Sequence, residues 1–191
     1  KFDHNLITVY LKNMKKILIT GGAGFVGSNT AMRFAQKGWS VHLIDNLSRK
    51  GTKNNLTNLK KNIKFKFYKI DISNFNLTAN LIKKLKPTLL IHCAGQVAVT
   101  TSVLEPRIDL NVNIIGTFNV LESIRLYSKK TKLINMSTNK VYGNIFERKI
   151  TEHKKRYDFQ GKVKSVDENC PLDFYSPYGC SKGSADQYVR D

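Results

Sequence analysis

Acidic residues, cysteine and histidine are all scarce in this chain, and each shortage excludes a class of protein. Only 14 aspartates and glutamates stand against 32 lysines and arginines in 191 residues, so the formal net charge is +18. The three cysteines have neither disulfide-framework nor metal-ligand spacing, which fits a reducing cytoplasm. His4, His42, His92 and His153 show no ligand spacing among them. We therefore expect no metal site, and we interpret His92 as a residue that packs at a strand end.

Long basic runs, internal repeats and low-complexity tracts are also missing. A net charge of +18 invites a nucleic-acid interpretation, because lysine and arginine gain affinity for phosphates by releasing counterions. The lysines are, however, scattered singly and in pairs, and no nucleic-acid-binding motif is present. We interpret the charge as a compositional bias of the surface and expect no nucleic-acid partner.

No long apolar run is found either. Residues 1–13 are too polar for a signal peptide or a membrane span, so we place them upstream of the fold and expect no membrane partner. Met14 directly precedes an apolar strand pattern, and the chain stops at Asp191 inside a helical pattern. The expectation is a single domain over 14–191 that is a fragment, incomplete at its C-terminal end.

Strand and helix patterns alternate along the chain, which is typical of a parallel sheet with crossover helices. The predicted strands are 16–20, 41–44, 63–70, 89–92 and 133–136, and the predicted helices are 25–37, 77–85, 108–126 and a last one from 176 onward. Residues 46–56 are predicted to be a polar loop, and 144–172 an inserted loop without periodicity. Pro87 closes the helix before it, because proline cannot continue one. The sequence thus predicts an α/β fold with a doubly wound, Rossmann-type parallel sheet.

A glycine-rich turn, Gly-Gly-Ala-Gly-Phe-Val-Gly at 21–27, joins the first strand to the first helix. In such a turn the backbone amides and the positive end of the helix face a phosphate. Glycines alone also make ordinary tight turns, so the context matters. Here Asp45 ends the next strand, where a carboxylate accepts hydrogen bonds from a ribose and repels a 2′-phosphate. This favours NAD over NADP, although Arg49 nearby tempers the preference.

Three further places in the chain hold candidate binding or catalytic residues. Asp71 and Ile72 follow the third strand, where they would contact an adenine ring, but Asp71 is equally well explained as a helix cap. Tyr178 and Lys182 lie four residues apart, so both project from one helix face. A tyrosine with a pKa near about 10 becomes a useful base only where a cation stabilises its phenolate. Thr138, after the fifth strand, is placed to hydrogen-bond the same substrate hydroxyl.

Four segments carry a family resemblance: 45–51, 95–102, 137–143 (Ser-Thr-Asn-Lys-Val-Tyr-Gly) and 173–183 (Asp-Phe-Tyr-Ser-Pro-Tyr-Gly-Cys-Ser-Lys-Gly). Over 15–191 the chain resembles the extended short-chain dehydrogenase/reductases that act on nucleotide sugars. The resemblance implies Thr138, Tyr178 and Lys182 as the catalytic set. It implies NAD contacts from Gly21, Gly24, Phe25, Val26, Gly27, Asp45, Asn46, Ser48, Arg49, Asp71, Ile72, Ala94, Gly95, Gln96, Tyr178 and Lys182. Asn113 matches a position that supports the active-site helix, or is simply a polar helix residue.

Within that family the four segments look most like the branch that acts on CDP-linked 3,6-dideoxy sugars of O-antigen lipopolysaccharide. The implied reaction is NAD-dependent epimerisation at C2 by transient oxidation, in a cytoplasmic homo-oligomer. A 4-epimerase or 4,6-dehydratase of the same family, or a non-catalytic NAD-binding module, stays open. Dehydratases carry an acidic pair after the threonine, and here those positions are Asn139 and Lys140. The sequence therefore favours epimerisation.

Overall fold

The computed structural model describes residues 14–143, 149–160 and 165–191. The main strands are β1 (Lys16–Thr20), β2 (Ser40–Asp45), β3 (Lys66–Lys69), β4 (Leu89–His92) and β5 (Lys132–Asn135). They form a five-stranded sheet in the order β3-β2-β1-β4-β5, with every pair parallel. After β3 the chain crosses back to lay β4 beside β1. The C-terminal ends of β1 and β4 therefore flank the switch point where ligands bind in such sheets.

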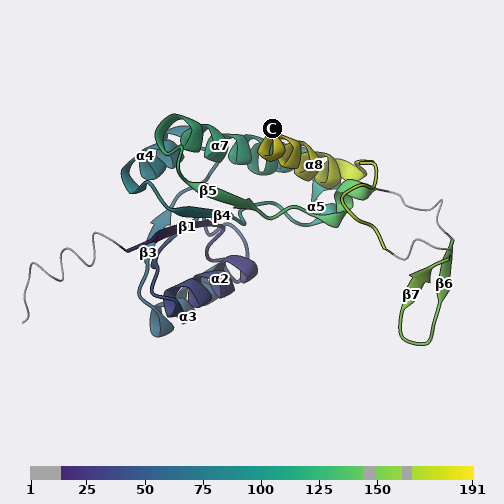
Figure 1. Ribbon diagram of the computed structural model, residues 1–191, viewed down its shortest axis with the longest axis horizontal. Coiled ribbons are helices and arrows are strands. Elements are labelled where there is room, and N and C mark those ends of the chain that lie inside the picture. The colour runs from purple at the N-terminus through teal and green to yellow at the C-terminus, as the bar shows by residue number, and fades with distance from the viewer. Residues whose placement is uncertain (1–13, 144–148, 161–164) are drawn as a thin grey trace, which may run out of the picture.

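Helices cover both faces of the sheet (Figure 1). On one face lie α2 (Phe25–Gln36) and α3 (Thr52–Asn62), and on the other lie α4 (Phe75–Leu85), α7 (Gly116–Tyr127) and α8 (Ser176–Arg190). The shorter helices α5 (Val99–Leu104) and α6 (Pro106–Asp109) follow β4, and a π-helical segment, η1 (Leu110–Ile115), joins α6 to α7. A 3₁₀ turn, η2 (Asn139–Tyr142), follows β5. The predicted α/β, Rossmann-type fold class is confirmed.

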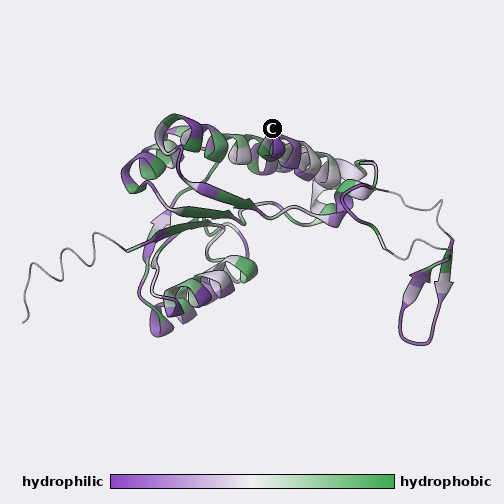
Figure 2. Cartoon of the chain, viewed as in Figure 1, coloured by the Kyte–Doolittle hydropathy of each residue, from purple (hydrophilic) through white to green (hydrophobic). Residues whose placement is uncertain are grey.

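The core has two parts, one on each side of the sheet. Ile17 and Ile19 of β1 belong to the cluster beneath α2 and α3, whereas Leu18 belongs to the cluster beneath α4 and α7. All three side chains are fully buried. Strands buried on both faces need apolar residues throughout, which explains their near-continuous hydrophobic sequence. Figure 2 shows this as green central strands between helices of mixed green and purple.

Three predictions of local structure were wrong. Residues 52–56, expected in a loop, open helix α3, which is polar except for a buried stripe of Thr52, Leu56 and Leu59. The range 108–126 is helical throughout as expected, but the prediction of one regular α-helix was wrong, because α6, η1 and α7 follow one another there. Within the insert expected to lack structure, β6 (Ile150–Glu152) and β7 (Tyr157–Phe159) pair as an antiparallel hairpin, which stands away from the sheet in Figure 1. The segment 1–13, placed upstream of the fold, lies outside the described residues.

Candidate functional site

A cavity of about 760 Å³ opens at the C-terminal ends of the strands. Its walls include fourteen of the sixteen predicted cofactor residues, all except Tyr178 and Lys182: Gly21, Gly24, Phe25, Val26, Gly27, Asp45, Asn46, Ser48, Arg49, Asp71, Ile72, Ala94, Gly95 and Gln96. Nine further lining residues were not predicted: Ile44, Thr52, Ile70, Cys93, Val97, Ala98, Thr101, Ile108 and Val112. Val97, Ala98 and Thr101 lie within the 95–102 segment, so that motif carried a signal for them. The structure thus brings residues from four strand ends together around one hollow.

The glycine turn forms the floor of this cavity, where it touches the loop after β4. Gly21 has φ +62°, and a Cβ atom there would lie 2.7 Å from the amide nitrogen of Ala94. A Cβ at Gly27 would overlap the carbonyl oxygen of Gly21. Helix α2 starts at Phe25 after Gly24, which offers no capping side chain. The first amides of α2 are thus available to an anion at the positive end of the helix.

Asp45 holds the glycine turn to the end of β2. Its Oδ2 accepts a hydrogen bond from the amide of Ala23 at 3.0 Å, and its Oδ1 accepts one from the amide of Leu47 at 2.8 Å. The side chain is buried. Each carboxylate oxygen has two lone pairs, so both keep capacity for a ligand hydroxyl at the cavity wall. Arg49 is exposed at the rim.

Asp71 belongs to a second polar cluster on the cavity wall. Its Oδ2 accepts from Asn46 Nδ2 at 2.8 Å, and its Oδ1 accepts from the amide and hydroxyl of Ser73 at 2.9 and 2.7 Å. Burial acts to raise the pKa of Asp71, but these hydrogen bonds outweigh it and lower the pKa. The alternative interpretation of Asp71 as a helix cap is wrong. Asn74 caps α4, because its Oδ1 accepts from the amide of Leu77 at 3.0 Å.

His92 ends β4 behind the cavity and is almost completely buried. Its Nδ1 lies 2.6 Å from Thr20 Oγ1 and its Nε2 lies 3.0 Å from Thr117 Oγ1. Burial, together with the nearby charge of Lys182, lowers the pKa of His92 to about 3. The ring is therefore neutral and joins β1, β4 and α7. The interpretation of His92 as a packed strand-end residue is confirmed.

Tyr178 and Lys182 lie one turn apart on α8, and both are buried. The Lys182 ammonium donates to the carbonyl oxygen of Met136, just after β5, at 2.6 Å. Burial lowers the pKa of Lys182, against the opposing influence of Asp186 and Cys93. Burial raises the pKa of Cys93 to about 11, although the charge of Lys182 acts against that rise. Cys93 lines the cavity, whereas Lys182 and Tyr178 are not among its lining residues.

Thr138 lies between β5 and the 3₁₀ turn η2. Its Oγ1 accepts a hydrogen bond from the amide of Lys140 at 3.3 Å and so caps η2. A hydroxyl that accepts through a lone pair can still donate its proton. The structure therefore places Thr138 two residues beyond Met136, the residue that Lys182 contacts. Asn139 and Lys140, which follow Thr138, are both exposed.

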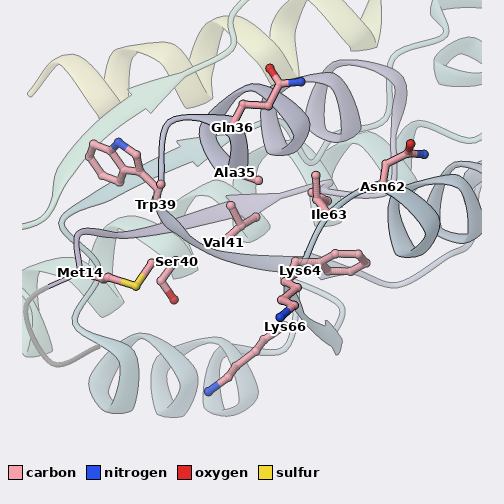
Figure 3. A pocket seen from close by; sticks show the side chains of 12 residues that line it. Met14, Ala35, Gln36, Trp39, Ser40, Val41, Asn62, Ile63, Lys64 and Lys66 are labelled. Carbon is pink, nitrogen blue, oxygen red and sulfur yellow. The ribbon is translucent and has the colours of Figure 1, made fainter. Parts of the chain in front are cut away.

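A second hollow, of about 600 Å³, lies at the opposite edge of the sheet (Figure 3). Trp39 and Met14 stand at one end of it and Asn62 at the other. The described residues that line it include no carboxylate, histidine or cysteine, so it lacks the acid–base groups of the first cavity. Elsewhere in the described residues, no three His, Cys, Asp or Glu side chains gather as metal ligands. No helix in the described ranges is long and apolar enough to cross a membrane.

Known proteins resemble this chain throughout its described fold. Residues 18–191 match the family described as GDP-mannose 4,6 dehydratase. The chain is 47% identical to CDP-paratose 2-epimerase of Salmonella typhi, over 92% of this chain and 52% of that protein. It is 33% identical to a putative UDP-glucose 4-epimerase of Methanocaldococcus jannaschii, over 91% of this chain and 50% of that protein.

Solved structures show the same similarity. The UDP-Glc/GlcNAc 4-epimerase of Campylobacter jejuni superposes with a TM-score of 0.76 at 33% identity, over 93% of this chain and 48% of that one. The UDP-glucose 4-epimerase of Thermus thermophilus, solved in complex with NAD, superposes with a TM-score of 0.71 at 27% identity, over 92% and 50%. The chain spans about half the length of the relatives that it matches.

Proposed function

Because this chain belongs to the GDP-mannose 4,6 dehydratase family of extended short-chain dehydrogenase/reductases, we propose that the protein uses NAD to epimerise C2 of a CDP-linked 3,6-dideoxyhexose. The proposed reaction converts CDP-paratose to CDP-tyvelose. The observation that carries the proposal is the 47% identity to CDP-paratose 2-epimerase of Salmonella typhi. In its support, Thr138 follows β5, and Lys182, one turn after Tyr178 on α8, donates to the carbonyl of Met136 just beyond β5.

The cavity fits a dinucleotide. The proposed pyrophosphate site is the glycine turn, where a Cβ at Gly21 would collide with Ala94 and where the first amides of α2 are uncapped. Asp45 is proposed to bind the adenosine ribose, with Asp71 and Ile72 beside the adenine. Bound there, NAD would accept a hydride and return it. We also propose that 14–191 form the cofactor-binding domain.

The chemistry of the sugar explains why a redox route suits these residues. The C2–H bond of a 3,6-dideoxy sugar is not acidic, and a ketone at C4 would not help because C3 separates it from C2. Oxidation at C2 avoids that difficulty, since the proton leaves from the C2 hydroxyl instead. Tyr178 is the proposed base for that proton, Lys182 stabilises its phenolate, and Thr138 hydrogen-bonds the same hydroxyl.

A 4,6-dehydratase is the second candidate within the family. Its elimination step needs an acid and a base beside the threonine, in addition to the tyrosine and lysine. In this chain Asn139 and Lys140 occupy those positions, and both are exposed on η2. The absence of a carboxylate at these two positions favours epimerisation.

Isotope retention tests the redox mechanism. Deuterium at C2 of CDP-paratose should stay on C2 through epimerisation, because it returns from the cofactor before it can exchange with solvent. Tyr178→Phe should leave NAD binding nearly intact and lower turnover by about a hundredfold or more. Tyr127→Phe, which changes a partly buried tyrosine at the far end of α7, is the matched control and should retain activity. Loss of the label to solvent, with no transient NADH, would exclude this route and leave Tyr178 without its assigned role.

Cofactor choice is a separate test. Asp45 at the end of β2 should repel a 2′-phosphate, so calorimetry should show tighter binding of NAD than of NADP to the protein. Asp45→Asn should narrow that difference. Equal or tighter binding of NADP by the wild type would contradict the assignment of Asp45.

We propose, finally, that the protein is a homodimer. Phe118 of α7 and Tyr188 of α8 are 43% and 54% exposed, and their rings pack edge to face with centroids 5.7 Å apart. Leu110 and Ile115 of η1 are also about half exposed. Such an apolar surface is typical of a self-association face. Light scattering should give a dimer mass for the protein and a monomer mass for Phe118→Lys.

A further inference from the structure

A cluster of four polar side chains lies where the loop after β4, the segment α6–η1 and helix α8 meet. Its members are Gln96, Asp109, Asn113 and Ser181. Asp109 and Asn113 are each 1% exposed and Ser181 is 3% exposed, although all three are polar. Burying polar groups is costly unless they are hydrogen-bonded, and here each is bonded to the others. We call this set the buried polar cluster.

Asp109 is the acceptor that joins the cluster. Its Oδ2 accepts from Gln96 Nε2 at 2.8 Å, and its Oδ1 accepts from Asn113 Nδ2 and Ser181 Oγ, both at 3.3 Å. The three donors come from three different segments: the cavity loop, η1 and α8. Only a side chain that accepts at both of its ends can receive all three bonds. A carboxylate does so, whereas an amide of the same size accepts at one end and donates at the other.

The cluster is bonded directly into the turn of α8 that carries Tyr178 and Lys182. Ser181 Oγ accepts from Asn113 Nδ2 at 2.9 Å. Its single proton is shared between two acceptors, Asp109 Oδ1 at 3.3 Å from Oγ and the carbonyl oxygen of Tyr178 at 3.0 Å from Oγ. Ser181 is adjacent in sequence to Lys182, whose ammonium reaches the end of β5. Asp109 is therefore bonded directly to the turn of α8 that joins Tyr178 to Lys182.

The same cluster fixes the loop that lines the cavity. The backbone amide of Gln96 donates to Asn113 Oδ1 at 2.9 Å. Asn113 Nδ2 lies 3.1 Å from the carbonyl oxygen of Gln96 and shares its two protons among that oxygen, Asp109 Oδ1 and Ser181 Oγ. The side chain of Gln96 also bonds both the amide and the carbonyl of Ala98. Gly95 permits this approach, because a Cβ there would lie 3.0 Å from Asn113 Oδ1. Gln96 is thus turned toward Asp109 and held in place.

We propose that Asp109 is a positioning residue for the epimerisation: it holds the helix that carries Tyr178 and Lys182 in register with the loop 95–98 on the cavity wall. The expected loss of turnover rests on the proposed function. The expected coupling of helix α8 to the loop 95–98 does not. Neither Asp109 nor Ser181 contacts the reacting atoms. Their effect passes through the placement of Tyr178 and Lys182, where small displacements lower turnover strongly.

The test compares Asp109→Asn and Ser181→Ala with a matched control in the protein loaded with NAD. Asp109→Asn keeps the size of the side chain but can accept at one end only. The control is Thr131→Val, an isosteric change at a buried threonine before β5 whose Oγ1 donates to the carbonyl of Pro87 at 2.7 Å. It removes a buried hydrogen bond at the opposite end of the sheet from the cavity. Turnover, NAD affinity, sugar-nucleotide KM and amide hydrogen exchange are measured for each variant.

Asp109→Asn should lower kcat by about tenfold or more, while the NAD Kd and the sugar-nucleotide KM change by less than about threefold. Amide exchange should accelerate in both 95–98 and 178–182, and in neither segment for Thr131→Val. The kcat losses of Asp109→Asn and Ser181→Ala should be less than additive in the double variant, because both break one linkage. If Asp109→Asn fails to fold, Ser181→Ala carries the same two readouts.

Unchanged kcat in a folded Asp109→Asn protein, or an equal loss of kcat in Thr131→Val, would overturn the inference. If the wild type does not epimerise CDP-paratose, the proposed function fails, and the exchange measurement alone decides the role of Asp109. Faster amide exchange in only one of the segments 95–98 and 178–182 of Asp109→Asn would show that Asp109 does not couple them. That result would also overturn the inference.

Discussion

Gly21 combines a left-handed backbone with a neighbour that leaves no room for a side chain. Its φ is +62°, and a Cβ would lie 2.7 Å from the Ala94 amide nitrogen. Gly21→Ala should therefore cost about 1–3 kcal/mol in the free energy of unfolding and weaken NAD binding by at least about tenfold. Calorimetry and urea unfolding measure the two effects.

Gly38 provides the control for Gly21, because it shares the backbone conformation but not the crowding. Its φ is +75°, and no atom lies within 4 Å of the position of a Cβ. Gly38→Ala should cost about 1 kcal/mol of stability and leave NAD affinity unchanged. Equal losses of NAD affinity in both variants would show that the contact with Ala94 is irrelevant.

Two buried histidines should make stability fall with acid. Burial, reinforced by Lys182, lowers the pKa of His92 to about 3, and burial with Lys66 and Lys16 lowers that of His42 to about 4. In the unfolded chain both titrate near about 6.5. The unfolded state therefore binds more protons below that pH, and the stabilising contribution present above about pH 6.5 is lost as pH falls toward the folded-state values. The loss approaches about 1.4 kcal/mol per pH unit for each histidine.

Urea unfolding at about pH 7 and pH 5 measures this slope. A double variant, His42→Gln with His92→Gln, removes both titrating groups and should show a flatter dependence. A wild-type slope no steeper than that of the variant would contradict the prediction.

At the scale of elements, Phe174 packs tightly against helix α8 just before that helix begins. Gly183 of α8 faces the ring of Phe174, and a Cβ there would lie 2.5 Å from Phe174 Cζ. Gly183→Ala should thus lower stability by about 1–3 kcal/mol through overpacking. Ser184→Ala, at the next, half-buried position, is the control and should change stability little in urea unfolding. An unchanged midpoint for Gly183→Ala would mean that Phe174 is free to move aside.

The sequence predicted those strands and helices whose buried residues form a clear apolar pattern. Strands β1, β2 and β4 are apolar runs because both faces are covered, and helix α2 follows directly from the glycine turn. Helix α3 was not predicted, because only Thr52, Leu56 and Leu59 are buried. Its other positions are polar, so the segment resembles a loop in sequence. The π-helical form of η1 was not predicted, because an apolar pattern of helical period does not distinguish a short π-helical segment from an α-helix.

Residues of the candidate site were likewise predicted only where a local sequence pattern places them. Residues at strand ends, such as Asp45 and Asp71, were found because the ends of parallel strands meet at one edge. The cavity wall formed by Cys93 and Val112 was not, since it depends on the path of the chain after β4. The role of Asp109 depends on contacts 13 and 72 residues away in the chain, which no local pattern contains.

At the scale of the whole molecule, the charge imbalance raises the question of non-specific binding. The net charge is +18, yet the lysines are spread over the chain. A gel-shift titration at physiological salt should show no saturable, sequence-dependent binding of DNA or RNA, because dispersed lysines give only weak, salt-sensitive attraction. Tight binding of one DNA or RNA sequence in preference to another would contradict this prediction and show that the protein has a second function.

The order of the strands also has a consequence for how the protein is made on the ribosome. β1 lies in the middle of the sheet, and its second partner, β4, begins only at Leu89. At about 5–20 residues per second, β1 waits several seconds of translation with one side unpaired, although Ile17, Leu18 and Ile19 end fully buried. During that interval the nascent chain presents the apolar strand that a chaperone would bind. The central position of β1 thus leaves one of its edges open to wrong partners from its own synthesis until β4 is made.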